Sequence, residues 1–397
     1  MFLRWCFFLN IFFLLCKNFY CEHWSTLFSA YDIHKIENSI SDYGKIDVSP
    51  DYFYEVTPPD IKTLQKIVLI AYQHNIPLRI RGSGHSFNGI SVPKPEELLV
   101  RMSGIDHYVF EEENTMTVGA GAVLWNVRDL AAQYKLKLPV YNEFTSGPTV
   151  GGFVCGGGIG GLASGKYGGF WEHVKTITIV SGKGELISFD RDNPEFAWFY
   201  GSMGQIGIIV EVKLKLLQQG GSPYPMGVSG KVPLFYPLDI QKNNAVFETK
   251  MNTGRWISLS IPLSLEREAT KFLFSMYNIY PDLIINKQFY RYLIKKFEFT
   301  PPLIYPKNED FVIIGMVGRT EIETDGDNRR LLIFERNFTS WSVMMGLKLY
   351  FQTQPHNRNM DYKQYFGTEV YEKFYLLKKK YDPKLILNRG SFFKNDE

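Results

Sequence analysis

Neither sign of charge predominates in this sequence. Its 397 residues include 44 Lys and Arg against 41 Asp and Glu, which leaves a formal net charge of only +3. The basic residues are also dispersed along the chain, so the sequence lacks the clustered positive patch that nucleic-acid binding requires. We therefore expect no nucleic-acid partner and infer that the partner is a small molecule.

Cysteine is scarce, with 4 residues in the whole chain. Cys6, Cys16 and Cys21 lie near the amino terminus, and Cys155 is the remaining one. If the amino-terminal segment is removed, Cys155 has no partner within the chain, which excludes an internal disulfide. The 7 histidines do not fall at metal-ligand spacings either, so we expect no metal site.

The sequence also lacks a hydrophobic run long enough to span a bilayer. The most apolar stretch, CFFLNIFFLLC at 6–16, follows Arg4 and has the length of a signal-peptide core. We predict a signal peptide at 1–21, a secreted or extracytoplasmic protein and no stable membrane span. An uncleaved amphiphilic anchor is the alternative, because no clear pattern of small residues precedes Glu22.

A chain of this length favours two domains. Strand-like and helix-like segments alternate in the first half, and the Gly- and Pro-rich segment QQGGSPYPMG at 218–227 is typical of a domain boundary. We therefore predict a ligand-binding domain at 22–218, a second α+β domain at 219–370, and a carboxy-terminal segment at 371–397 that packs back on the first domain.

Several elements follow from local patterns. Apolar residues at helical spacing after Pro59 predict an amphipathic helix, which we expect Thr57 to cap. VKTITIVSGKGELISFD at 174–190 predicts a β-hairpin, and the alternating segment IGIIVEVKLKLL at 206–217 predicts an edge strand. In the second domain we predict strands at 255–263, 311–318 and 347–353, and helices at 266–277 and 325–337.

Glycine is concentrated in two loops, GSGHSFNG at 82–89 and TSGPTVGGFVCGGGIGGLASGKYGG at 145–169. Because glycine costs conformational entropy on folding, such density indicates backbone that lies close to a ligand or to another part of the chain. Peptide N–H groups in such loops bind phosphate oxygens, which makes a pyrophosphate the expected ligand. His85 is the single imidazole in the first loop.

Other nucleotide-binding and hydrolase motifs fit poorly. GGLASGK at 160–166 resembles the phosphate-binding loop of ATPases, but Tyr167 occupies the place of the metal-holding Ser or Thr, and no strand precedes the loop. GGGIGG at 156–161 is a weak match to the dinucleotide fingerprint. The segment GHS is not followed by the glycine of a serine-hydrolase elbow.

Four blocks in order resemble the PCMH-type FAD-binding family, the vanillyl-alcohol oxidase superfamily. They are RIRGSGHSFNG at 79–89, TVGG…GG at 149–161, HVKTITIVSGKGELI at 173–187 and GSMGQIGIIVEV at 201–212. The tail at 371–393 also fits, and within the family these segments are most similar to cytokinin dehydrogenases. The resemblance implies an α+β fold: a two-subdomain FAD-binding domain, an α+β substrate (cap) domain, and a carboxy-terminal tail that returns to the FAD domain.

The resemblance also assigns residues to the FAD cofactor. His85 matches the family's histidine that bonds covalently to the flavin 8α-methyl group. A neutral imidazole is a suitable nucleophile, and the bond raises the oxidising power of the flavin. The alternatives are a non-covalent loop histidine at this position and ordinary core packing for Ile159, Ile209 and Tyr350. The implied cofactor-binding residues are Arg81, Gly82, Ser83, Gly84, His85, Ser86, Thr149, Gly152, Cys155, Ile159, Ile209, Tyr350, Asn388 and Ser391.

The chain departs from its relatives near the second loop. Berberine-bridge-type enzymes have a second covalent link, through a cysteine, where this chain has Gly147, so a single histidyl bond is expected. Cytokinin dehydrogenases have an aspartate where this chain has Phe144. The adjacent Glu143 is therefore our predicted catalytic base, with a surface glutamate as the alternative. Val150 resembles the small residue that leaves molecular oxygen a path to the ring, and Lys348 is a candidate cation for the reduced flavin.

We therefore predict an FAD-dependent oxidoreductase, an oxidase or dehydrogenase that takes a hydride from a CH–OH or CH–NH group of a small molecule, with oxygen as a candidate acceptor. Three alternatives stay open: a flavin-binding protein with little catalytic activity, a cytokinin dehydrogenase proper, and a nicotinamide-dependent flavin reductase of the cell-wall type. The aromatic second domain is expected to supply the substrate-binding wall, with Trp256, Tyr305 and Trp341 as candidates.

Overall fold

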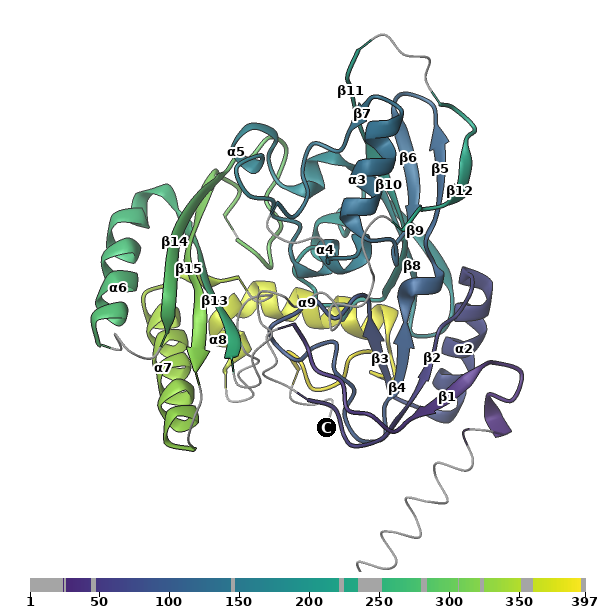
Figure 1. The fold of residues 1–397 in the computed structure, drawn as a ribbon, viewed down its shortest axis with the longest axis horizontal. Coiled ribbons are helices and arrows are strands. Elements are labelled where there is room, and N and C mark those ends of the chain that lie inside the picture. The colour runs from purple at the N-terminus through teal and green to yellow at the C-terminus, as the bar shows by residue number, and fades with distance from the viewer. Residues whose placement is uncertain are drawn as a thin grey trace, which may run out of the picture.

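Two large sheets form the amino-terminal part of the molecule and a third large sheet lies beside them (Figure 1). Residues 136–137 and 217–218 pair as a small two-stranded sheet. The predicted signal peptide lies outside the described residues, so secretion stays a prediction. The computed structural model describes residues 24, 26–43, 48–143, 147–220, 225–234, 252–279, 284–305, 307–321, 325–350 and 360–393.

The first sheet has four strands in the order β1-β2-β4-β3. β2, β4 and β3 run parallel, and α2 connects β2 to β3 and buries the predicted apolar stripe on this sheet. The expected cap was wrong: Asp60, not Thr57, caps α2, and its carboxylate accepts the Thr63 N–H at 2.7 Å. The bounds are β1 (Ile33–Ile36), β2 (Phe53–Val56), α2 (Ile61–His74), β3 (Leu78–Arg81) and β4 (Leu98–Arg101).

The second sheet has six strands in the order β12-β5-β6-β10-β8-β9, all antiparallel. The predicted hairpin at 174–190 is confirmed as β8 and β9. The elements of this region are β5 (His107–Glu111), β6 (Thr115–Gly119), α3 (Leu124–Gln133), β7 (Leu136–Lys137), α4 (Val150–Gly156), α5 (Ser164–Tyr167), β8 (Val174–Val180), β9 (Leu186–Asp190), β10 (Ile208–Lys215), β11 (Leu217–Gln218) and β12 (Ser229–Lys231).

The prediction of an edge strand for β10 was wrong. β10 pairs with β6 on one side and β8 on the other, so it lies inside the sheet. Its alternation arises because Glu211, Lys213 and Lys215 face outward while the residues between them are buried. An antiparallel strand with one solvated face shows this pattern wherever it lies in the sheet. Beyond the predicted domain boundary, β12 still pairs with β5 of the same sheet.

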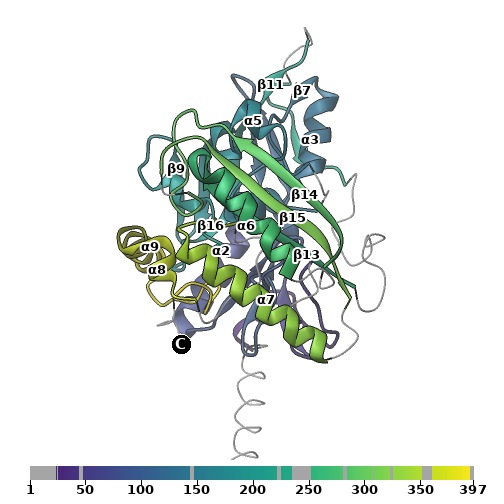
Figure 2. The same ribbon diagram turned by 90° about the vertical axis from the view of Figure 1, so that its left-hand side faces the viewer.

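The third sheet, which we call the C-terminal sheet, has the order β14-β15-β13-β16 and is antiparallel. α6 and α7 cover one of its faces, and the other face is directed toward the first two sheets (Figures 1 and 2). The sequence analysis missed β14. The bounds are β13 (Asn252–Pro262), α6 (Glu266–Ile279), β14 (Ile285–Ile294), β15 (Phe311–Glu321), α7 (Asp325–Met344) and β16 (Lys348–Leu349).

The carboxy-terminal segment returns to the first sheet. α9 (Thr368–Tyr381) ends two residues before Pro383, which cannot continue a helix, and Leu387 then forms a parallel bridge with Leu78 of β3. Lys378 and Asp382 make a fully buried ion pair of 2.8 Å at the turn between helix and tail. The remaining helices are α8 (Tyr362–Phe366), α9 (Thr368–Tyr381) and the 3₁₀ helices Met102–Gly104, Phe170–His173, Phe196–Phe199 and Leu263–Leu265.

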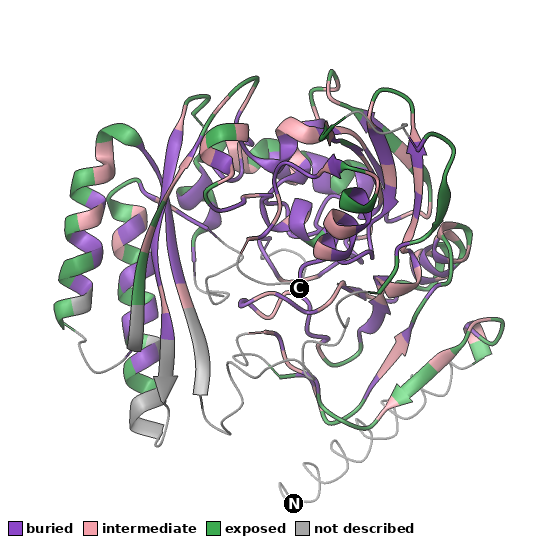
Figure 3. Cartoon of the chain, turned by 45° about the horizontal axis from the view of Figure 1, so that its top comes forward, coloured by how far each residue is buried: buried purple, intermediate pink, exposed green. Residues whose placement is uncertain are grey.

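Buried residues follow the strands of all three sheets, and exposed residues follow the outer sides of the helices (Figure 3). One core cluster lies between α2 and the first sheet, and a larger one joins the second sheet to the C-terminal sheet. Among the described residues, no helix combines the length and the apolar character needed to cross a membrane.

Candidate functional site

The first glycine-rich loop follows β3 directly and its backbone geometry requires glycine. Gly84 has a φ of +75°, and a β-carbon there would overlap the Arg81 guanidinium. A β-carbon on Gly82 would likewise overlap the Thr149 hydroxyl. The loop therefore passes between Arg81 on one side and the second glycine-rich loop on the other, with no room for side chains at these two positions.

The second loop forms the facing wall at the start of α4. Thr149 caps this helix and accepts the Gly152 N–H at 3.2 Å. The Ser83 hydroxyl donates to the Gly147 carbonyl and ties the two loops together. Gly151 packs against Ala120 of the second sheet, where a β-carbon would crowd the Ala120 methyl group. The two loops predicted from glycine density are thus neighbours in the fold.

The third wall joins the segment before β10 to the carboxy-terminal tail. The Asn388 side chain accepts the Ile80 N–H at 2.9 Å and donates to the Met203 carbonyl at 3.2 Å. Gln205 donates to the Asn388 carbonyl at 3.0 Å. Asn388 therefore connects β3, the segment before β10 and the tail at one point.

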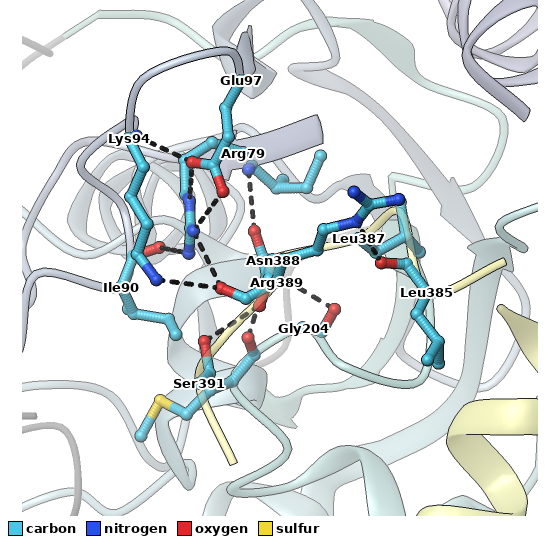
Figure 4. Close-up of polar contacts among 12 residues, drawn as sticks. Arg79, Ile90, Lys94, Glu97, Gly204, Leu385, Leu387, Asn388, Arg389 and Ser391 are labelled. Carbon is cyan, nitrogen blue, oxygen red and sulfur yellow. Dashed lines mark hydrogen bonds and ion pairs between the residues drawn. The ribbon is translucent and has the colours of Figure 1, made fainter. Parts of the chain in front are cut away.

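Buried charged side chains bind the carboxy-terminal tail beside this wall (Figure 4). Arg79 and Glu97 form a bidentate ion pair with distances of 2.8 and 2.6 Å. Arg79 and Lys94 also donate to the Arg389 carbonyl at 3.1 and 3.2 Å. Because a buried ion pair is strongly destabilised by loss of one partner, this network makes the tail part of the folded core of the first sheet.

These three walls enclose what we call the cofactor pocket, with about 810 Å³ of atom-free space, part of it open to solvent. Its lining combines backbone, small side chains and apolar side chains. Among the described lining residues, only His85 and Cys155 have ionisable side chains. The lining residues are Ile80, Gly82, Ser83, Gly84, His85, Ser86, Ile90, Ser91, Met102, Ala120, Pro148, Thr149, Gly151, Gly152, Cys155, Gly156, Met203, Gly204, Gly207, Ile208, Ile209 and Asn388.

His85 and Cys155 are the two nucleophilic side chains of the pocket. His85 is 8% exposed, and burial lowers the pKa of its imidazole to about 3. The ring is therefore neutral at physiological pH, which is the nucleophilic form. Burial also raises the pKa of the Cys155 thiol to about 12, so it is protonated and unreactive as a thiolate.

The structure brings most of the predicted cofactor-binding residues to this pocket but leaves four outside its lining. Arg81 supports the loop from outside, donating to the Ser41 and Ser91 carbonyls at 2.9 and 3.2 Å. Ile159 is half-buried beside the core, and Tyr350 lies against Gly157 after α4. Ser391 bonds the Asn388 carbonyl and lines a neighbouring cavity.

The predicted base lies elsewhere as well. The Glu143 carboxylate accepts the N–H groups of Leu162 and Ala163 at 2.7 and 2.9 Å, which orders the turn before α5. Glu143 does not line the cofactor pocket. Phe144 lies outside the described residues. Lys348 is also remote from the lining: its ammonium donates to the Tyr365 carbonyl, and burial lowers its pKa to about 8.

Sequence reasoning missed pocket residues that carry no distinctive side chain. Met203, Gly204, Gly207 and Ile208 belong to GSMGQIGIIVEV, a block that was recognised but from which only Ile209 was chosen. The glycines of that block were the available signal. Ile80, Met102 and Ala120 lie on strands or directly after them, and Ser91 lies in a turn after the first loop; tertiary packing turns all four toward the pocket.

The C-terminal sheet presents a different surface on its inner face, the face turned toward the first two sheets. Residues alternate along a strand, so Trp256 and Ser258 share a face of β13, and Trp256 contacts Phe87 of the first loop with ring centroids 5.9 Å apart. Tyr290 of β14 reaches across β15 over Gly315, and its hydroxyl bonds both Trp256 Nε1 and Ser258 Oγ. We define the inner face by Trp256, Ser258, Ser260 and Tyr290.

Of the three aromatic residues predicted as substrate wall, only Trp256 has this placement. Trp341 of α7 stacks on Phe272 of α6, on the opposite side of the sheet. Tyr305 is buried and donates to Glu309 at 3.1 Å. The inner face also contains the hydroxyl of Ser260, which is fully buried and has no hydrogen-bond partner among the described residues.

The pocket fits FAD in its chemistry. The backbone of the glycine loops can approach a pyrophosphate closely, because at Gly82 and Gly84 any side chain would collide with protein. Apolar residues such as Met102, Ile208 and Ile209 suit the flat faces of the dinucleotide rings. His85 adds a neutral nucleophile at the same site.

Comparison with known proteins finds similarity over the region that contains both glycine-rich loops of the pocket. Residues 54–190 match the family model described as FAD binding domain. A stretch of 194 residues, 48% of this chain, is 26% identical to an FAD-linked oxidoreductase of Aspergillus ruber and covers 38% of it. A stretch of 179 residues, 43% of this chain, is 31% identical to a tetrahydroberberine oxidase of Berberis wilsoniae and covers 32% of it.

A plant enzyme named cytokinin dehydrogenase 3, from Arabidopsis thaliana, is 26% identical over 190 residues, which are 46% of this chain and 36% of the relative. The chain thus matches less than half the length of each of these relatives. The matched region contains β2 to β9 and both glycine-rich loops of the pocket. Residues 54–190 of this chain are therefore similar to an FAD-binding domain, in agreement with the sequence resemblance to PCMH-type flavoproteins.

Proposed function

We propose that this protein is an FAD-dependent oxidoreductase whose FAD occupies the cofactor pocket and is tethered through His85. The observation that carries the proposal is the neutral, buried imidazole of His85 in a pocket lined by two glycine-rich loops and free of Asp, Glu, Lys and Arg side chains. Because no Lys or Arg is among the described lining residues, peptide N–H groups and hydroxyls would have to stabilise the negative charge of the reduced flavin.

The chain's own residues would divide the work of holding FAD. Backbone N–H groups of Gly82 to Ser86 would bind the pyrophosphate, and Thr149 and Gly152 would form the facing side. Asn388 would close the pocket from the tail. When bound, FAD supplies a ring that accepts a hydride from a carbon next to a hydroxyl or amine nitrogen, and molecular oxygen is the proposed final acceptor.

We propose that the first two sheets are the two subdomains of the FAD-binding domain and that the C-terminal sheet is the substrate domain. Its inner face supports this assignment, because it carries an indole and three hydroxyls and touches the His85 loop through the Trp256–Phe87 contact. Trp256, which is only partly buried, would stack on a ring of the substrate, and the Tyr290 hydroxyl, which bonds its Nε1, would hold the indole in place. The proposed substrate is therefore a small ring compound with hydroxyl or amine groups.

A flavin-binding protein with little catalytic activity is the second candidate. The placement of Glu143 favours it, because the predicted base is engaged by two backbone N–H groups and does not line the pocket. For Glu143 to take the substrate's proton, its carboxylate has to reach the substrate while it still accepts the N–H groups of Leu162 and Ala163. The proposal keeps Glu143 as the base on sequence grounds alone.

The experiment that tests the function uses the purified full chain. We expect a yellow protein whose flavin absorption bleaches when a substrate from a panel of hydroxylated and amino ring compounds is added, and returns with oxygen as peroxide accumulates. A colourless protein would contradict FAD binding. Stable colour across the panel would support the silent binder, and bleaching by NADPH alone would indicate a nicotinamide-dependent reductase.

A further inference from the structure

A short amino-terminal segment, far from the glycine-rich loops in sequence, is bonded along the outside of the His85 loop. We call residues Ser41–Tyr43 the clasp. Arg81 Nη2 donates to the Ser41 carbonyl at 2.9 Å, and the Gly89 N–H donates to the Asp42 carboxylate at 2.9 Å. The Tyr43 N–H donates to the Ser86 carbonyl at 3.0 Å. The clasp is therefore bonded near both ends and at the centre of the loop.

The clasp places an aromatic ring on His85. The ring centroids of Tyr43 and His85 are 4.2 Å apart with an angle of 32° between the planes. Tyr43 also packs edge-on against Phe87, with centroids 5.2 Å apart, and burial raises the pKa of its hydroxyl. The imidazole thus lies between the Tyr43 ring and the cofactor pocket, of whose lining it is part.

The two residues that flank His85 in the loop place no large side chain beside its ring. Gly84 has no side chain, and the Ser86 hydroxyl pairs with the Ser91 hydroxyl at 3.0 Å. A histidine has two free side-chain torsions, and a nucleophile that samples several rotamers rarely adopts the geometry for attack. A stacked aromatic ring restricts the plane of the imidazole and keeps water from one of its faces.

We propose that Tyr43 is a positioning residue for the attachment of FAD, because its ring holds the His85 imidazole in the plane that meets the flavin 8α-methyl group. This inference rests on the proposed function. In the attachment, a bond forms between an imidazole nitrogen and the 8α carbon, and the imidazole proton and one methyl hydrogen are lost. The two electrons released pass through the ring to molecular oxygen, which leaves with both protons as hydrogen peroxide.

The test measures attachment and not turnover. Full-length apo-protein is mixed with FAD in air, and samples are denatured in acid at intervals. The protein mass and the flavin absorption of the precipitate then give the covalent fraction. We expect Tyr43→Ala to attach FAD about tenfold more slowly than wild type or worse, while Tyr43→Phe, which keeps the ring, stays within about twofold of wild type. Tyr52→Ala is the control, because Tyr52 is 43% exposed and packs on Lys35, away from the loop.

Each alternative result has a defined meaning. Wild-type attachment rates in Tyr43→Ala would overturn the inference and leave the proposed function intact. Equal loss in Tyr43→Phe would overturn the ring-packing argument, and loss of non-covalent FAD binding in Tyr43→Ala would show a general role in loop folding instead. If wild type itself releases all its flavin in acid, the covalent tether fails and the inference fails with it. If Tyr43→Ala does not fold, Tyr43→Leu replaces it, because leucine fills the volume without a flat ring.

Discussion

The cofactor pocket and the inner face of the C-terminal sheet are built in opposite ways. The pocket is made of backbone and small residues, and its features follow from short continuous segments such as 82–86 and 148–156. The inner face is made of side chains from β13 and β14 that meet over β15, with Tyr290 reaching Trp256 and Ser258 over Gly315. The comparison teaches that the proposed FAD binding would depend on close backbone approach, whereas the proposed substrate selection would depend on side-chain placement.

The largest expected effect distinguishes covalent attachment of FAD through His85 from non-covalent binding of FAD in the cofactor pocket. His85→Ala should abolish covalent attachment completely, because no other imidazole lines the pocket, while the glycine loops still bind FAD non-covalently. Mass spectrometry of the acid-denatured protein measures the tether, and absorption of the native protein measures binding. Flavin that remains acid-stable in His85→Ala would place the attachment at another residue, with Cys155 as the next to examine.

The second effect concerns backbone approach. Gly84→Ala should lower FAD content by about tenfold or more, because it adds a collision with Arg81 to the cost of a positive φ, itself of order 1 kcal/mol. Gly220→Ala is the matched control, since Gly220 has a φ of +89° but no atom near its β-carbon position. FAD titration and thermal unfolding measure both variants. If Gly84→Ala and Gly220→Ala lost equal amounts of FAD binding and of thermal stability, backbone strain, and not the collision with Arg81, would explain why the loop has glycine at position 84.

The third effect is a pH dependence of stability in the apo-protein. The pKa of His85 falls from its ordinary 6.5 to about 3 in the folded chain, so below pH 6.5 the unfolded chain binds a proton that the folded chain excludes. Stability should therefore decrease as pH falls from 6.5 toward 3, by roughly 1.4 kcal/mol per pH unit, and this contribution should be constant above pH 6.5. The difference in unfolding free energy between wild type and His85→Gln, followed against pH, separates the contribution of His85 from that of the carboxylates, which titrate in both proteins. A difference that does not change with pH would contradict a buried neutral imidazole.

The smallest effect tests the inner face. Tyr290→Phe removes hydrogen bonds to Trp256 and Ser258, which are worth about 0.5–1.5 kcal/mol each, and should raise KM by about threefold to tenfold without changing FAD content. Tyr72→Phe, on α2 behind the first sheet, should leave both quantities unchanged. A fall in FAD content in Tyr290→Phe would break the division between the cofactor pocket and the inner face.

The sequence was informative where structure depends on neighbours along the chain. The strand and loop around His85, the hairpin of β8 and β9, and the end of α9 before Pro383 all follow from local patterns. The errors lie where several local solutions compete. Both Thr57 and Asp60 can cap a helix, and Asp60 does so because α2 begins directly after it. The alternation of β10 reports one solvated face but not the number of neighbouring strands.

Contacts between distant segments could not be predicted in this way. Asn388 and Ile80 are 308 residues apart, and the clasp residue Tyr43 has no sequence signal that pairs it with His85. Residues such as Met203 and Ala120 enter the pocket because of how whole sheets pack. The sequence therefore predicts the chemical groups of the site and its two glycine-rich loops, but only the folded structure shows which residues contact them.

The hydrogen bond between Asn388 and the Ile80 N–H has a consequence for biosynthesis. During translation, β3 leaves the ribosome about 300 residues before the asparagine that completes its edge. The cofactor pocket of a nascent chain thus stays incomplete until Asn388 has been synthesised and has docked on β3. If FAD binds as proposed, acquisition of yellow colour would report that docking.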